Sequence, residues 1–213
     1  MSLQGMLVGL EPFCRYLVAT GRKARIVDGA PDLHTGFFFP DRNVIALEDS
    51  PIDLVSLHLG GSIGLSENLA SPSFAVGVRG IPLVGRKVSP IQYHWVVRLQ
   101  KTAYPWLATK LVQETRGFVR RERVGMRWTG KLVGPRFEAD PGIMEALASW
   151  IRIHDVLEVR PEPDRRLVRI VHKRSASFSY NLFDAEVFKV DRDHAGARLI
   201  DAFERMAVIL RAT

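Results

Sequence analysis

The sequence predicts an α+β protein: an antiparallel β-rich body with a short N-terminal helix, a helix near residues 141–153 and a C-terminal helix near residues 194–211. Two observations predict this class. Short apolar runs separated by turn-forming residues follow one another through the first two thirds of the chain, as in antiparallel sheets. Apolar residues three and four positions apart, typical of helices, occur near the N-terminus and twice in the C-terminal third.

The N-terminal helix is expected over Glu11–Thr20. Pro12 suits a first helical position, and Gly21 suits the position just past the helix end. Strand patterns follow, because short apolar runs alternate with turn residues such as those at 40–43. We expect these strands over residues 25–27, 36–39, 44–47 and 52–59.

The middle of the chain continues the sheet after a Gly/Ser-rich stretch at 60–73. Two short strands are expected there, over 74–78 and 81–84. The clearest strand is Gln92–Leu99, in which Tyr93, Trp95, Val97 and Leu99 share one face. Residues 106–113 fit either a helix or a strand, and residues 118–128 are expected to be extended.

The C-terminal third combines two helices with further strands. Asp140 is a suitable N-cap before Pro141, and a helical stripe follows. Two strands flank 161–164, and a third is expected over 177–183. Asp193 caps the last helix, and both helices are expected on one face of a small sheet. The stripes of the two helices are Ile143, Leu147, Trp150 and Ile151, and then Leu199, Phe203, Met206 and Leu210.

The chain forms either a single domain over 1–213 or two lobes that divide near residues 60–73. Apolar residues make up 46% and charged residues 25% of the 213, which is ordinary for a globular protein. Cys14 is the one cysteine, so no internal disulfide can form, and a buried unreactive thiol is expected. Cytoplasmic localisation follows from these features. Met1–Leu3 before Met6 is typical of an added leader, which leaves room for a targeting or membrane segment upstream.

Basic residues are concentrated between Asn68 and Arg136. This segment holds 13 of the 30 Lys and Arg residues and two of the 23 Asp and Glu residues, so its net charge is +11 against −4 elsewhere. A field of one sign attracts partners of the opposite sign. The favoured function is therefore a non-catalytic binding or assembly module whose basic sheet face meets an acidic protein surface, a nucleic acid or an anionic membrane surface. The plain alternative is an arginine-rich face that contacts only solvent.

The residues proposed to bind a polyanion are Arg121, Arg123 and Arg127. If residues 116–129 are extended, these side chains share one face and the apolar side chains lie mostly on the other. Guanidinium groups can contact phosphates or carboxylates with two hydrogen bonds. A second basic strip consists of Arg165, Arg166, Arg169, Lys173 and Arg174.

A small serine hydrolase is the alternative function. Gly60-Gly61-Ser62-Ile63-Gly64 matches the Gly-x-Ser-x-Gly nucleophile elbow, although only about one helical turn follows it before Pro72. The catalytic acid and histidine would be Asp164 and His172, or Asp184 and His194. A third possibility is a small-molecule binder with a pocket between sheet and helices.

No cofactor and no metal are expected. Asp191, Asp193 and His194 are interpreted as helix-capping residues rather than metal ligands, because no second ligand cluster stands at a recognisable spacing. The sequence lacks the glycine-rich motifs of dinucleotide and P-loop sites.

Overall fold

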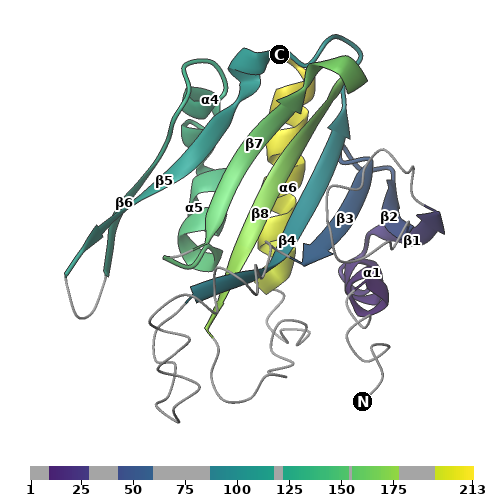
Figure 1. Ribbon diagram of the computed structural model, residues 1–213, viewed down its shortest axis with the longest axis horizontal. Coiled ribbons are helices and arrows are strands. Elements are labelled where there is room, and N and C mark those ends of the chain that lie inside the picture. The colour runs from purple at the N-terminus through teal and green to yellow at the C-terminus, as the bar shows by residue number, and fades with distance from the viewer. Residues whose placement is uncertain (1–9, 29–42, 60–86, 118–121, 154, 178–194) are drawn as a thin grey trace, which may run out of the picture.

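The computed structural model describes residues 10–28, 43–59, 87–117, 122–153, 155–177 and 195–213. It confirms the α+β class. Within these ranges, eight strands form one antiparallel sheet in the order β1-β2-β3-β4-β8-β7-β5-β6 (Figure 1). The strands are β1 (Lys23–Asp28), β2 (Asn43–Glu48), β3 (Leu54–Leu59), β4 (Lys87–Arg98), β5 (Thr109–Arg116), β6 (Glu122–Trp128), β7 (Val156–Glu162) and β8 (Leu167–Ser177).

The three expected helices are all present. Asp140 caps the second of them, accepting a hydrogen bond from the Ile143 N–H at 3.2 Å. Gly21 follows the first with φ +87°, a conformation that glycine adopts without strain. The described helices are α1 (Leu10–Ala19), α4 (Gly134–Glu138), α5 (Pro141–Trp150) and α6 (Ala195–Arg211), with 3₁₀ turns η4 (Pro105–Leu107) and η5 (Pro163–Arg165).

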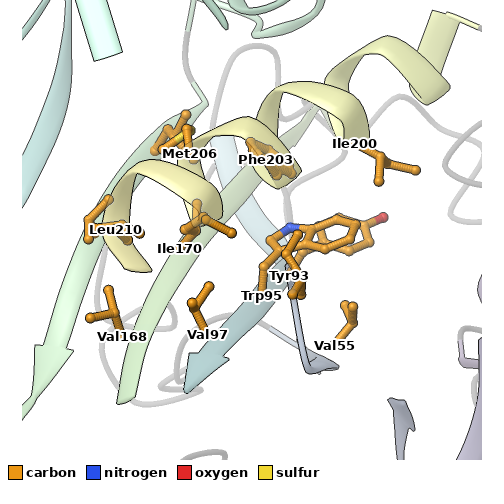
Figure 2. Packing of buried hydrophobic residues seen from close by; sticks show 14 of the residues in the cluster. Val55, Tyr93, Trp95, Val97, Val168, Ile170, Ile200, Phe203, Met206 and Leu210 are labelled. Carbon is orange, nitrogen blue, oxygen red and sulfur yellow. The ribbon is translucent and has the colours of Figure 1, made fainter. Parts of the chain in front are cut away.

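The helices pack on one face of the sheet and bury the main core against it (Figure 1). Figure 2 shows Phe203 and Met206 of α6 above side chains of β4 and β8. Trp95 of β4 lies at the centre, with its ring 5.1 Å from Phe203 and 5.9 Å from Phe13 of α1. The alternation predicted for β4 is confirmed, because Tyr93, Trp95 and Val97 all point into this core.

The opposite face carries no described helix, and we call it the helix-free face. Five of its basic side chains are paired with carboxylates of the same or neighbouring strands, whereas Lys110 and Arg116 of β5 form no salt bridge within the described ranges. These pairs are Arg25–Glu48, Arg127–Glu114, Arg160–Glu158, Lys173–Glu158 and Arg169–Glu162. The described part of this face is therefore neutralised in part.

Some expectations are refined and others lie outside the described ranges. Residues 106–113, which fitted a helix or a strand, divide between η4 and β5. The short helix α4 was not expected. The runs 36–39, 74–78 and 81–84, most of 177–183 and the possible lobe boundary at 60–73 lie outside the described residues. None of the helices in the described ranges has both the length and the apolar character needed to cross a membrane.

Candidate functional site

Two of the three arginines proposed as a polyanion platform, Arg123 and Arg127, lie on opposite faces of the sheet. Arg127 lies on the helix-free face, with its Nε 3.4 Å from a carboxylate oxygen of Glu114. Arg123 points to the other face, toward the end of α5. Arg121 lies outside the described residues. The structure therefore separates Arg123 from Arg127, in contrast to the expectation from strict alternation.

A β-bulge in β6 causes this separation. Glu114 of β5 pairs with Gly125, and the next residue of β5, Thr115, pairs with Arg123. Val124 is therefore an extra residue in β6. Because successive side chains of a strand point to opposite faces, one inserted residue turns those beyond it to the other side.

Arg123 instead closes the C-terminus of α5. Its Nη1 donates to the Ala148 carbonyl oxygen at 2.8 Å, and Nη2 donates to the Ile151 carbonyl. Its Nε donates to the Gln113 side-chain oxygen at 3.0 Å. Burial lowers the pKa of Arg123, and the nearby charge of Asp155 opposes that shift. Since the last carbonyls of a helix lack partners within it, we assign Arg123 a structural role.

The second basic strip is also largely engaged. Arg169 is only 2% exposed and pairs with Glu162. Its Nη1 lies 3.4 Å from Nδ1 of His94. Glu162 also contacts Arg165 at 3.5 Å, so one carboxylate joins the hairpin to the buried arginine. Lys173 pairs with Glu158 at 2.9 Å.

Exposed basic and aromatic side chains gather at the end of the sheet where β4, β6 and β7 end and β5 and β8 begin. This end lies at the top of Figure 1, beside the C-terminus. The residues come from the β4–β5, β6–α4 and β7–β8 connections. We call the following seven residues the basic end: Arg98, Lys101, Tyr104, Trp106, Lys131, Leu132 and Arg166, all exposed.

The side chains of the four cations of the basic end form no salt bridge among the residues that the structure describes. The backbone N–H of Arg98 donates to the Asp53 carboxylate at 2.7 Å, and that carboxylate pairs with Arg211. The three connections contain a single acidic residue, Asp164. Four strand intervals separate β4 from β6, and at about 4.8 Å each the cations spread over about 19 Å. The basic end is thus distinguished by the number of cations without a salt bridge that lie close together.

Buried anchors hold the exposed side chains in place. Ala103 and Leu107 belong to the main core, and Tyr104 and Trp106 between them turn outward. The ring centroids of this pair are 4.2 Å apart, and the ring planes differ by 8°. Gly130, at φ +91°, brings the Lys131 loop against the same segment, because a Cβ there would lie 2.9 Å from the Ala108 carbonyl oxygen.

His172, a candidate triad histidine, is buried on the helix-covered face. Its Nε2 lies 3.3 Å from Oδ2 of Asp155, and its ring lies 5.9 Å from that of Phe203. Asp164 lies in η5, before the first residue of β8. His172 lies five residues into β8, which is about 17 Å along the strand from its start. The His172 partner is therefore Asp155 rather than Asp164. Ser62, Asp184 and His194 lie outside the described residues, so the serine hydrolase interpretation stays a prediction.

Cys14 is buried. Burial raises the pKa of its thiol, and the charge of Glu11 raises it further. Both effects disfavour the thiolate, which is the reactive form of cysteine. The expectation of a buried thiol is confirmed, and Cys14 is not a candidate nucleophile.

The aromatic pair is the part of this site that sequence reasoning missed. Treating 106–113 as one regular element placed Trp106 inside it, although the structure puts Trp106 in a 3₁₀ turn before β5. The available clue was Tyr104-Pro105-Trp106 soon after Lys101. Two aromatic residues on either side of a proline indicate a loop rather than a core strand.

No protein-family model matches this chain, and no curated protein or solved structure matches it. Its function is therefore inferred from its own residues.

Proposed function

We propose that the protein is a non-catalytic binding or assembly module that meets an acidic partner through the basic end. The clustering of four cations that form no salt bridge within the described ranges carries this proposal. Five basic side chains of the helix-free face are paired with carboxylates, and Lys110 and Arg116 of β5 form no salt bridge in the described part of the chain but lie apart from each other along that strand. At the basic end, four cations without a salt bridge among the described residues lie together. Like charges held near one another repel, and an anionic partner relieves that repulsion.

The proposal keeps the partners predicted from the basic block but moves the contact surface. Arg98, Lys101 and Lys131 belong to the block 68–136, and Arg166 belongs to the second basic strip. An acidic protein surface, a nucleic acid and an anionic membrane surface would each supply the required negative charge. A chain with one cysteine fits a reducing compartment, so we include a cytoplasmic location in the proposal.

Retention on a heparin column tests the proposal. The test variant is Lys101→Gln/Lys131→Gln/Arg166→Gln. Its matched control removes three other exposed cations that form no salt bridge within the described ranges, as Arg116→Gln/Arg152→Gln/Arg198→Gln. Both variants lose the same net charge. The basic-end variant should elute at clearly lower salt than the control, since clustered cations neutralise a polyanion together.

Equal elution of the two variants would contradict the proposal, because net charge alone would then explain retention. Failure of the unmodified protein to bind heparin would contradict it as well. Circular dichroism and urea unfolding of both variants check that folding is intact, as expected for exposed side chains.

A further inference from the structure

The aromatic pair of the basic end is a rigid, exposed stacking surface. Tyr104 is 44% and Trp106 58% exposed, and the other three tryptophans are at least partly buried. The two rings are nearly parallel, and Pro105 between them has a fixed φ. Burial of Ala103 and Leu107 fixes both ends of the turn. A flat ring surface held in this way loses little entropy when another ring stacks on it.

Cations lie on both sides of the aromatic pair. Arg98 and Arg166 lie beside each other at the β4–β8 side, where the Leu99 N–H donates to the Arg166 carbonyl oxygen at 2.8 Å. Lys131 lies at the β6 side, beyond β5. The turn that holds the rings contacts β7, between these two positions. From β4 toward β6, the order of groups along this end of the sheet is therefore Arg98 and Arg166, then the two stacked rings, then Lys131.

A row of charges about 19 Å long, centred on stacked rings, matches a linear polyanion that carries rings of its own. Residues at the ends of neighbouring strands form a row of this kind because the strands lie side by side in the sheet. Guanidinium groups of Arg98 and Arg166 can each contact a phosphate with two hydrogen bonds. A lipid surface would use the same cations but would gain nothing from parallel stacking, since it offers no ring.

We propose that the basic end binds single-stranded nucleic acid, with a base stacked on the Tyr104–Trp106 pair and the flanking phosphates on Arg98, Arg166 and Lys131. This inference rests on the proposed function and names its partner. A base of any identity can stack in this way, because every base presents a π-face. Binding is therefore expected to be largely independent of sequence and strongly dependent on salt.

Fluorescence anisotropy with a labelled oligothymidylate of about 12 nucleotides, within the 4–16 nucleotides that one small domain typically covers, tests the inference. Three variants are compared with the unmodified protein: Trp106→Ala, Trp106→Phe and the control Val124→Ala, which removes an exposed apolar side chain elsewhere. Trp106→Ala should weaken oligothymidylate binding about 5- to 150-fold, the loss expected for one stacked base. Trp106→Phe should retain most of the affinity, and Val124→Ala should retain all of it.

Heparin, a duplex of the same length and vesicles with phosphatidylserine serve as comparison probes. Heparin carries no bases, so Trp106→Ala should leave its binding unchanged. If the protein binds heparin but not oligothymidylate, the inference fails and the proposed function stands. If it binds neither, both fail. If Trp106→Ala weakens the binding of heparin and of oligothymidylate equally, stacking on a base is ruled out. The same holds if Trp106→Ala weakens only the binding of vesicles.

Discussion

Arg166 occupies a backbone conformation that glycine adopts more easily. Its φ of 53° and ψ of 40° lie in the left-handed region, which costs about 1–2 kcal/mol for a residue with a Cβ. Its N–H donates to the Pro163 carbonyl oxygen at 3.2 Å, which fixes the hairpin. The exposed side chain adds a cation to the basic end and no salt bridge within the described part of the chain. The strained backbone together with the exposed cation makes Arg166 a residue whose role in binding can be tested separately from its role in the fold.

We therefore expect Arg166→Gly to weaken polyanion binding without weakening the fold. Relief of the left-handed strain and the greater entropy of unfolded glycine offset each other, so the free energy of unfolding should change by less than about 1 kcal/mol. Urea unfolding and heparin retention measure the two effects. Arg166→Val is the control, because a β-branched residue at this φ should destabilise the hairpin. A marked loss of stability in Arg166→Gly would show that the arginine side chain supports the fold.

The helix α5 illustrates how neighbouring elements complete one another. Its start is fixed locally, by the Asp140 side chain and Pro141. Its end depends on β5 and β6, because Gln113 and Arg123 supply hydrogen-bond donors to carbonyls of residues 148–155. The start could be predicted from the sequence, whereas the end required the bulge in β6. One extra residue in a strand leaves no clear mark in the sequence, yet it decided the role of Arg123.

Replacing the two arginines of β6 separately tests this assignment. Arg123→Ala should lower the free energy of unfolding by about 1.5–3 kcal/mol, because partly buried carbonyls lose a charged donor. Arg127→Ala should change it by less than about 1 kcal/mol, since its pair with Glu114 is exposed. Urea unfolding at neutral pH gives both values. If both replacements lowered the free energy of unfolding by the same amount, the structural role assigned to Arg123 would be wrong.

At the scale of the whole molecule, the sequence predicted the class and the periodic elements but not the distribution of charge. Helical stripes and the alternation in β4 are local patterns, and both are present in the structure. The pairing of Glu158 with Lys173 required the β7–β8 register, whereas its pairing with Arg160 lies within β7. The basic end combines three connections distant in sequence, so no single segment could reveal it. The basic block was therefore recognised, but the gathering of several of its cations at one end of the sheet was not.

The ion pairs of the helix-free face also predict how stability depends on pH. Burial disfavours ionisation of Glu158, but Lys173 and Arg160 outweigh this effect and hold its pKa below the ordinary value. A carboxylate with a lowered pKa stabilises the fold above its unfolded pKa, about 4.3, and loses this contribution as the pH falls through the folded pKa. Glu158→Gln should therefore be less stable than the unmodified protein at pH 7, and the difference should narrow below about pH 4.3.

Urea unfolding at several pH values measures this difference. Glu145→Gln is the control, because Glu145 is exposed on α5 and forms no salt bridge within the described ranges. Its effect should be small at every pH. A Glu158→Gln effect that stays constant from neutral to acidic pH would mean that the carboxylate contributes through packing rather than charge.

The most direct test of the central claim is an NMR titration of the protein with a heparin oligosaccharide at low salt. We predict that the largest shift changes appear at Lys101, Lys131, Arg166 and the Trp106 indole, all at the basic end. Signals of the paired residues on the helix-free face, such as Arg25, Arg127 and Lys173, should change little. Shift changes centred on that face, with the basic end unaffected, would contradict the account.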